Sequence, residues 1–356
     1  MFFSSSKQKP LFGLDIGSSA IKLVQLREAK NGYSLERLGI KALDPEMIVD
    51  GTVMDAGRVG DLLKELLNEQ KIKLKEVAIA ISGHSVIVKK IMVPAMSEDE
   101  LEESIKWEAE QYIPFDINDV NIDFHVLGAV DGPDGQPQMN VLLIAAKKDK
   151  LTEYTSLVTE AGLTPMVVDV DAFTIENMFC VNYDTQDNEV VALINIGASV
   201  MNINILKGST SAFTRDITVG GNRYTETLQK ELNLGYQDAE NAKLVENPTD
   251  INPETVASVI SAVNNEVAGE ITRSIDYFRG TAGQENLDRV YLCGGAAKTR
   301  GLVQLVGERL GVSVELINPF NRIEVDPKQF TPDRLQEMAP QAAVGVGLAI
   351  RKVGDR

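Results

Sequence analysis

The feature that most limits the fold of this chain is a short glycine-containing motif that occurs twice, half a chain apart. Residues 14–19 read Leu-Asp-Ile-Gly-Ser-Ser, and residues 194–199 read Ile-Asn-Ile-Gly-Ala-Ser, in a chain of 356 residues. In both copies an apolar strand leads into a polar residue and a glycine turn, and a second apolar strand follows. Asp15 and Asn195 occupy equivalent positions in the two copies. The repeated pattern predicts two matching β-hairpins in two related halves.

The two predicted turns have the composition of an anion-binding site. Glycine has no Cβ, so the backbone N–H groups of such turns can approach a phosphate closely, and two turns that face each other could hold a polyphosphate from both sides. Asp15 could hold a divalent cation through water, and Lys22, on the outgoing strand, could reach a phosphate as a point charge. One such motif alone is more often an ordinary hairpin turn.

A third glycine motif favours the nucleotide interpretation. Residues 290–293, Val-Tyr-Leu-Cys, predict a short buried strand that opens into Gly294, Gly295 and Ala296. Backbone without bulky side chains at this point could lie against a base or a ribose. The two hairpin copies and this motif together predict a nucleotide site rather than three unrelated turns.

The rest of the chain mixes helical and strand patterns, with hairpins beside β–α steps. Such a mixture favours an α/β fold with mixed sheets over a purely parallel, doubly wound sheet. Apolar periodicity predicts helices at residues 59–70, 151–161, 172–179, 256–278, 302–310 and 342–353, and a capping box at Ser97 and Glu100 predicts another that ends before Pro114. Apolar runs predict strands at residues 77–81, 86–93, 122–130, 139–146, 166–170 and 312–317, with a turn at residues 131–135.

Composition excludes several classes of function. Lys and Arg number 35 against 52 Asp and Glu, a net charge of −17 with no dense basic run, which argues against nucleic-acid binding. The two cysteines, Cys180 and Cys293, form no Cys-x-x-Cys motif and predict neither a zinc site nor a disulfide framework. Residues 1–10 lack the apolar core of a signal peptide, so a cytoplasmic location is expected. Residues 190–206 are uncharged, but three asparagines predict strands there rather than a membrane span.

In this order, the motif at residues 13–22, the second turn at Asn195 and the motif from Gly294 to Ala296 resemble the actin-like ATPase superfamily. The segment 91–124, centred on Lys-Trp-Glu-Ala-Glu-Gln-Tyr-Ile-Pro-Phe, is similar to the PilM family of type IV pilus assembly proteins, relatives of the division protein FtsA. The resemblance covers nearly the whole chain. It implies an α/β, actin-like bilobal fold with duplicated mixed-sheet halves, and ATP with Mg²⁺ in a central cleft.

The resemblance also implies a division into four parts. They are the core of lobe 1 with the first phosphate loop (residues 1–85, 166–189 and 335–356), an inserted FtsA/PilM-type subdomain (86–165), the core of lobe 2 with the second phosphate loop and the adenosine motif (190–219 and 288–334), and a helical subdomain of lobe 2 (220–287).

Individual site residues follow from the match to the family's motifs. The first phosphate loop would consist of Asp15, Gly17, Ser18, Ser19 and Lys22, with Asp15 also at the metal. The second would consist of Asn195, Gly197, Ala198 and Ser199. The resemblance places Gly220 and Gly221 near the ribose, Glu240 and Lys243 on the adenine side, and Gly294, Gly295 and Ala296 near the adenosine.

One residue departs from the superfamily's pattern. Actin-like ATPases usually carry Asp at the second turn, where it helps to bind the metal and to orient the attacking water, and this chain has Asn195. An amide can neither act as a base nor carry the charge. We therefore expect ATP binding with weak or absent hydrolysis, and we assign no catalytic residue.

The implied role is that of a cytoplasmic scaffold on the inner face of the inner membrane. By resemblance, the chain would bind the N-terminal cytoplasmic tail of PilN in an apolar groove between lobe 1 and the inserted subdomain, and nucleotide would tune lobe closure. The membrane would be reached only through this partner. Contacts with an assembly ATPase or a platform protein, and a homo-oligomer or ring, are left open.

Two other functions are weighed against this role. An FtsA-like filament-forming division protein usually carries a C-terminal amphipathic membrane helix, and residues 351–356 show none. A small-molecule kinase of the actin fold needs a carboxylate base facing the cleft, and Asn195 argues against one.

Other candidate motifs are expected to carry no chemistry. His84 and His125 lie in or beside predicted strands without metal-ligand spacing. The sequence Asp-Val-Asp at residues 169–171 is more typical of caps and turns than of a metal pair. Residues 345–350 fail as a dinucleotide-binding fingerprint, and residues 296–299 fail as a P-loop.

Overall fold

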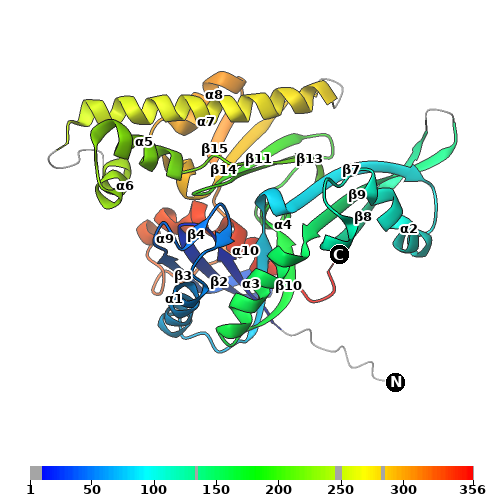
Figure 1. Cartoon of the computed structure of the whole chain (residues 1–356), viewed down its shortest axis with the longest axis horizontal. Helices are drawn as coiled ribbons and strands as arrows, with labels where there is room; N and C mark the ends of the chain where they lie inside the picture. Colours follow the sequence, from blue (N-terminus) through cyan, green and yellow to red (C-terminus); the bar gives the residue numbers. More distant parts are fainter. Residues whose placement is uncertain (1–9, 133–134, 245–250, 282–284, 356) are drawn as a thin grey trace.

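The computed structural model describes residues 10–132, 135–244, 251–281 and 285–355, and its strands form three main sheets (Figure 1). Residues 1–9, on which the expected absence of a signal peptide depends, and residues 133–134 of the expected turn lie outside the described residues.

The strands and helices are as follows. The strands are β1 (Phe12–Ile16), β2 (Ala20–Ala29), β3 (Gly32–Ala42), β4 (Ile48–Val49), β5 (Thr52–Val53), β6 (Glu76–Ile81), β7 (Val86–Pro94), β8 (Val120–Asp131), β9 (Pro137–Lys147), β10 (Thr164–Val170), β11 (Val190–Ile196), β12 (Met201–Lys207), β13 (Thr210–Ile217), β14 (Arg289–Cys293), β15 (Ser313–Leu316) and β16 (Ile323–Glu324). The α-helices are α1 (Ala56–Glu69), α2 (Glu98–Glu110), α3 (Lys148–Glu160), α4 (Asp171–Asn182), α5 (Asn222–Leu232), α6 (Tyr236–Leu244), α7 (Pro253–Thr281), α8 (Leu302–Leu310), α9 (Pro332–Met338) and α10 (Ala343–Ile350). Short 3-10 helices are η1 (Gly83–Ser85), η2 (Ile117–Asp119), η3 (Gly295–Lys298) and η4 (Ala339–Ala342).

The two larger sheets have the same arrangement of strands. Their orders are β10-β6-β1-β2-β3-β16 and β15-β14-β11-β12-β13. In each sheet the first hairpin strand pairs antiparallel with the second and parallel with the strand on its other side (β1 with β2 and β6, β11 with β12 and β14). The sequence prediction of mixed sheets in two related halves is therefore confirmed.

A matching β-bulge strengthens the relation between the halves. The pairing of β2 with β3 shifts between Gln25 and Leu26, and the pairing of β12 with β13 shifts between Ile205 and Leu206. A bulge adds one residue to one strand and increases its twist. Because both irregularities stand at the same place after the turn, the two sheets bend in the same way.

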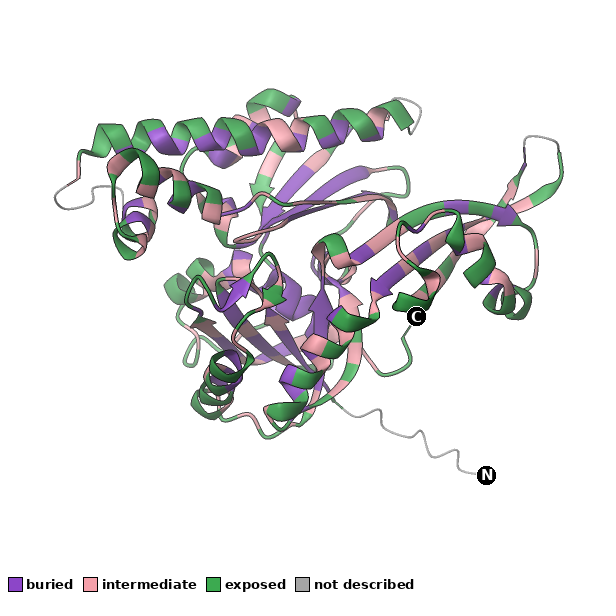
Figure 2. Ribbon diagram, in the orientation of Figure 1, coloured by how far each residue is buried: buried purple, intermediate pink, exposed green. Residues whose placement is uncertain are grey.

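Helices cover both sheets and form the layer between them. Alternate residues of β11 face opposite cores: Val191 and Leu193 join a core shared with the first sheet, α4 and α10, whereas Ala192 and Ile194 face α5, α6, α7 and α8. The other face of the first sheet packs on α1 and α3. Helices α4 and α10 therefore connect the two sheets through one apolar core, which appears as buried ribbon at the centre of Figure 2.

The third sheet, ordered β7-β9-β8, lies to one side and has a core of its own with α2 (Figure 1). The predicted capping box starts α2, because Ser97 Oγ accepts from the backbone N–H of Glu100 and the Glu100 carboxylate accepts from the N–H of Ser97. Helix α3 packs instead on α1 and β10, and β16 pairs with β3 of the first sheet.

The C-terminal helix packs closely because its contacts are made by glycines. A Cβ on Gly347 would overlap the carbonyl oxygen of Thr174 in α4, and one on Gly13 in β1 would come within 2.7 Å of the Ala349 nitrogen. The helix ends at Ile350, before the predicted end at residue 353. There the backbone of Arg351 becomes extended, and its Nε lies 3.1 Å from Asp169 Oδ2 in an ion pair with little exposure.

We expect Gly347→Ala to destabilise the protein by roughly 1–3 kcal/mol or more, because the new methyl group overlaps backbone that cannot move easily. The matched control is Gly280→Ala in α7, where a Cβ would meet open space. Alanine there should leave the free energy of unfolding unchanged or raise it slightly. Urea denaturation measures both, and equal effects of the two substitutions would contradict the packing described here.

Candidate functional site

The first hairpin brings an ammonium group and a carboxylate to its turn. The N–H of Gly17 donates to the carbonyl of Ala20 at 3.1 Å, which closes the turn around Ser18 and Ser19. Asp15 and Lys22 stand opposite each other on β1 and β2, with Lys22 Nζ 3.1 Å from Asp15 Oδ2. A Cβ on Gly17 would lie 2.7 Å from Lys22 Nζ, so the glycine leaves room for this amine beside the turn.

The second hairpin repeats this geometry with different side chains. The N–H of Gly197 donates to the carbonyl of Val200 at 3.0 Å, closing the turn that contains Ser199. Asn195 faces Asn202 across the strands, and its Nδ2 donates to Asn202 Oδ1 at 2.9 Å. A neutral amide pair therefore stands where the first hairpin has an ion pair.

The loop before α5 lies directly against the second turn. The N–H of Gly221 donates to the carbonyl of Gly197 at 2.9 Å, and the N–H of Asn222 donates to that of Ala198 at 2.8 Å. A Cβ on Gly220 would lie 2.5 Å from the carbonyl oxygens of both turn residues. Only glycine permits this approach, so the loop and the turn form one rigid backbone surface.

Two charged side chains from α6 complete this end of the second lobe. Lys243 Nζ lies 2.5 Å from Glu240 Oε1, donates to Thr225 Oγ1 at 3.0 Å and reaches the carbonyl of Gly221 at 3.4 Å. Thr225 also hydrogen-bonds to Glu240. The structure therefore brings the predicted adenine-side residues next to the predicted ribose-side glycines.

The glycine motif after β14 joins the same cluster. Gly294 has a φ of 87°, which favours glycine, and a Cβ on it would come within 2.5 Å of Asn195 Oδ1. The Cβ of Ala296 lies 3.3 Å from the place of a Cβ on Gly221, and Gly295 connects Gly294 to Ala296 in the chain. The predicted residues of the second lobe thus form one continuous surface, while the first hairpin belongs to the other sheet.

Asp171, at the start of α4, connects the two sheets electrostatically. Its pKa is raised to about 7: burial is the largest cause, the charges of Asp15 and Asp216 act in the same direction, and a hydrogen bond from Ser82 and the charge of Lys22 act against them. Asp171 is therefore within electrostatic reach of both the first hairpin and β13. The sequence analysis expected residues 169–171 to form only caps and turns. The signal that could have identified Asp171 is a carboxylate where a predicted strand passes into a predicted helix.

The donor set at the first hairpin suits a cation held mainly by water and phosphate. Within the described residues, no cluster of three or more His, Cys, Asp or Glu side chains is placed to hold a metal ion. Asp15 supplies one carboxylate, and Mg²⁺ commonly takes one or two carboxylates together with waters and phosphate oxygens. The residues thus fit Mg²⁺ as a companion of a polyphosphate and do not form a closed metal cage.

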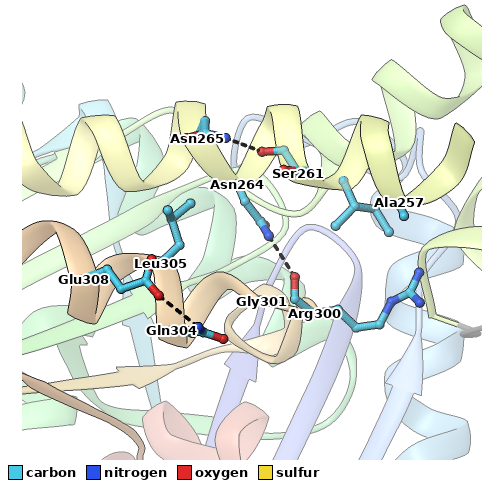
Figure 3. Close-up of a pocket in the computed structure, with 10 residues that line it drawn as sticks. Ala257, Ser261, Asn264, Asn265, Arg300, Gly301, Gln304, Leu305 and Glu308 are labelled. Carbon is cyan, nitrogen blue, oxygen red and sulfur yellow. Dashed lines mark hydrogen bonds between the residues drawn. The ribbon is translucent and has the colours of Figure 1, made fainter. Parts of the chain in front are cut away.

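Cavities also open away from the hairpin turns. One, of about 440 Å³, opens where the third sheet meets the rest of the protein, and it is lined by Gly83, His84, Val86, Ile87, Val88, Pro114, Phe115, Val170, Ala172, Thr214, Arg215 and Asp216. Another, of about 370 Å³, lies between α7 and α8 around Asn264 and Arg300 (Figure 3) and contains none of the predicted site residues. Among the helices of the described ranges, none is both long and apolar enough to cross a bilayer.

Comparisons with known proteins place this geometry in a wider group. A family model described as "Type IV pilus assembly protein PilM" matches residues 13–353. A solved structure titled "PilM-PilN type IV pilus biogenesis complex" is 32% identical, with a TM-score of 0.87 over 98% of this chain and 100% of that one. The ethanolamine utilization protein EutJ from Carboxydothermus hydrogenoformans shares the fold, with a TM-score of 0.58 at 15% identity over 96% and 92% of the two chains.

Among curated proteins, the cell division protein FtsA of Streptococcus pneumoniae is 23% identical in an alignment 355 positions long that covers 86% of this chain and 75% of that protein. The predicted actin-like fold with two mixed-sheet α/β halves is confirmed.

We expect Asp171→Asn to stabilise the nucleotide-free protein at pH 8 by an amount on the order of a few kcal/mol. An acid whose pKa is raised by folding, here to about 7, keeps its proton longer in the folded state, so stability falls as the pH rises from about 4 through 7. The asparagine variant lacks this loss, and its advantage should shrink towards pH 5. Urea denaturation in EDTA measures the free energy of unfolding at each pH, and Asp187→Asn, which changes an exposed residue, is the control. A stability gain of Asp171→Asn that does not change with pH would contradict the prediction.

Proposed function

The chain belongs to the PilM family of type IV pilus assembly proteins, and we propose that it is an ATP-binding scaffold that holds the N-terminal tail of PilN. The observation that carries the nucleotide part is the pair of matching glycine turns, each closed by the same backbone hydrogen bond, with the two glycine loops packed on the second. The similarity to a PilM solved with PilN supports the partner.

In this proposal the first turn and Lys22 bind phosphate, and Asp15 holds Mg²⁺, which neutralises phosphate charge when bound. Asn195, Gly197, Ala198 and Ser199 would contact the phosphates from the second lobe. Gly220, Gly221, Glu240, Lys243 and the motif from Gly294 to Ala296 would hold the nucleoside. The hydrogen bonds and close contacts among the second-lobe residues support one common ligand for them, because these residues share a surface.

We propose weak or absent hydrolysis because the second turn lacks a carboxylate. Asn195 cannot accept a proton, and its amide already donates to Asn202. Asp171 is the acid within electrostatic reach of Asp15, and a pKa of about 7 leaves it partly protonated at neutral pH. Any residual turnover should therefore depend on Asp171.

We expect Lys22→Met to weaken ATP binding at least about tenfold, because it removes the ammonium group beside the first turn. Isothermal titration calorimetry with Mg-ATP measures this, and Lys30→Met, an exposed lysine in the following turn, is the matched control. Equal affinities of the two variants would refute the phosphate role of Lys22.

Phosphate release by the wild type should stay near background. Magnesium-dependent turnover well above background would refute the proposal of weak or absent hydrolysis.

For the PilN tail we propose the 440 Å³ cavity, which lies between the third sheet and the start of α4. Its apolar lining includes Val86, Val88 and Phe115, and the Phe115 ring is held under Lys147 Nζ, 4.4 Å from the ring centroid. An apolar groove with a few polar groups at its rim suits a short amphipathic segment. Through this partner the protein would sit on the inner face of the inner membrane.

Nucleotide would tune the groove by changing lobe closure, which requires different nucleotide affinities in the two closure states. We also propose the four-part division that the resemblance implies. The separate core of the third sheet supports the inserted unit, whereas α3, within that segment, packs with the first lobe, and β16, within the lobe 2 segment, pairs with β3 of the first sheet. Assembly ATPase, platform protein and self-association are further candidate contacts.

We expect Phe115→Ala to weaken binding of a fluorescent PilN-tail peptide by about tenfold or more, because an aromatic ring is removed from the groove. Tyr277→Ala, an exposed aromatic residue on α7, should leave peptide affinity unchanged. If the two sites are coupled, saturating Mg-ATP should change the affinity for the peptide by some factor. Saturating peptide should then change the affinity for Mg-ATP by the same factor. Equal peptide affinity of the two variants would mean that the tail binds another surface. A peptide affinity that Mg-ATP leaves unchanged would refute the proposed coupling.

A further inference from the structure

Three polar side chains stand directly opposite one another on three adjacent strands of the second sheet. Asn195 on β11 faces Asn202 on β12, and Asn202 faces Asp216 on β13. Asn195 Nδ2 donates to Asn202 Oδ1 at 2.9 Å, and Asn202 Nδ2 donates to Asp216 Oδ1 at 2.8 Å. Both asparagines are buried, so the row forms a fixed polar network within the sheet.

The same three positions in the first sheet carry different chemistry. There Asp15 faces Lys22, and Lys22 faces Ile40. The negative charge thus stands next to the turn in the first half, whereas in the second half it stands two strands away, at Asp216. The second sheet has not lost its carboxylate; it holds the carboxylate at the opposite end of the row from the turn.

Asp216 dictates the direction of every hydrogen bond in the row. Both oxygens of its carboxyl group accept hydrogen bonds, Oδ1 from Asn202 Nδ2 and Oδ2 from the N–H of Gly83 at 2.6 Å. Asn202 must therefore turn its NH₂ group to Asp216 and its oxygen to Asn195. Asn195 must in turn direct its own NH₂ group at Asn202.

This direction leaves the oxygen of Asn195 on the side of the glycine loop that follows β14. A Cβ on Gly294 would lie 2.5 Å from this oxygen. The thiol of Cys293 approaches it at 3.9 Å, and burial raises the pKa of that thiol, which keeps it a weak donor. The amide oxygen of Asn195 therefore keeps the capacity to accept a hydrogen bond from a stronger donor.

We propose that Asp216 is a positioning residue for the nucleotide site: acting through Asn202, it holds the Asn195 amide with its oxygen, and not its NH₂ group, towards bound Mg-ATP. An amide oxygen suits a cation and its waters, whereas an NH₂ group in its place would oppose them. The inference rests on the proposed nucleotide site. It explains how a neutral turn still contributes an oxygen where the first hairpin uses Asp15.

Asp216→Asn tests this by reversing the row while keeping it fully hydrogen-bonded. The new amide would still accept from Gly83 and would donate to Asn202, which would then donate to Asn195, so the NH₂ group of Asn195 would turn towards the ligand. We expect the ratio of ATP affinity with Mg²⁺ to that in EDTA to fall about tenfold, with metal-free affinity equal or higher. Asp187→Asn, which removes one exposed charge, should keep the wild-type ratio.

Side-chain amide exchange in nucleotide-free protein gives a second readout. In wild type the Asn195 NH₂ group is bonded to Asn202 and should exchange slowly, and in Asp216→Asn it should exchange fast, while that of Asn202 stays protected. If Asp216→Asn fails to fold, Asn202→Ala cuts the row and should also lower the magnesium dependence. If Asp216→Asn changes neither the affinity ratio nor the amide exchange, the inference is wrong. If the wild type binds no ATP with Mg²⁺ or in EDTA, the proposed nucleotide site is wrong instead. Amide exchange would still test the orientation of Asn195 in that case.

Discussion

Direct contact between backbone segments at the second hairpin is the constraint on which the candidate site depends. The turn, the loop before α5 and the loop after β14 approach so closely that Gly220 and Gly294 leave no space for a Cβ. Hydrogen bonds from Gly221 and Asn222 then fix the turn's carbonyl groups. These bonds hold the turn in place, and the glycine backbone beside it has no side chains that would keep a ligand away.

Electrostatics explains why a phosphate ligand would need a cation here. Burial raises the pKa of Asp171 to about 7 and also raises that of Asp216, and the charge of Asp15 contributes to the first shift. These acids surround the junction of the two sheets, and Lys22 is already paired with Asp15. A polyphosphate alone would add to this negative charge, whereas one bound together with Mg²⁺ would reduce it.

Local patterns predicted the parts of the fold that local interactions decide. The hairpins, the capping box at Ser97 and the long α7 follow from alternation, capping and helical periodicity. Strands β3 and β13 were not predicted, because a bulge in each breaks the period of two and puts Leu35 and Leu38, three residues apart, in the same core. The proposed roles of Asp171 and Asp216 were missed for a different reason: they depend on residues far away in the sequence, Asp15 for Asp171 and Gly83 for Asp216.

The junction at Gly83 gives the proposed coupling a physical route. Asp216 uses one oxygen for the row that orients Asn195 in this proposal and the other for the N–H of Gly83, which has a φ of 81° and begins η1, the short helix that leads into β7 of the third sheet. His84, the next residue, lies 2.6 Å from Thr218 Oγ1 through its Nε2. Gly83, His84 and Asp216 also line the proposed groove. In the proposed coupling, a movement of β13 relative to the first lobe would change the orientation of Asn195 and the shape of the groove together.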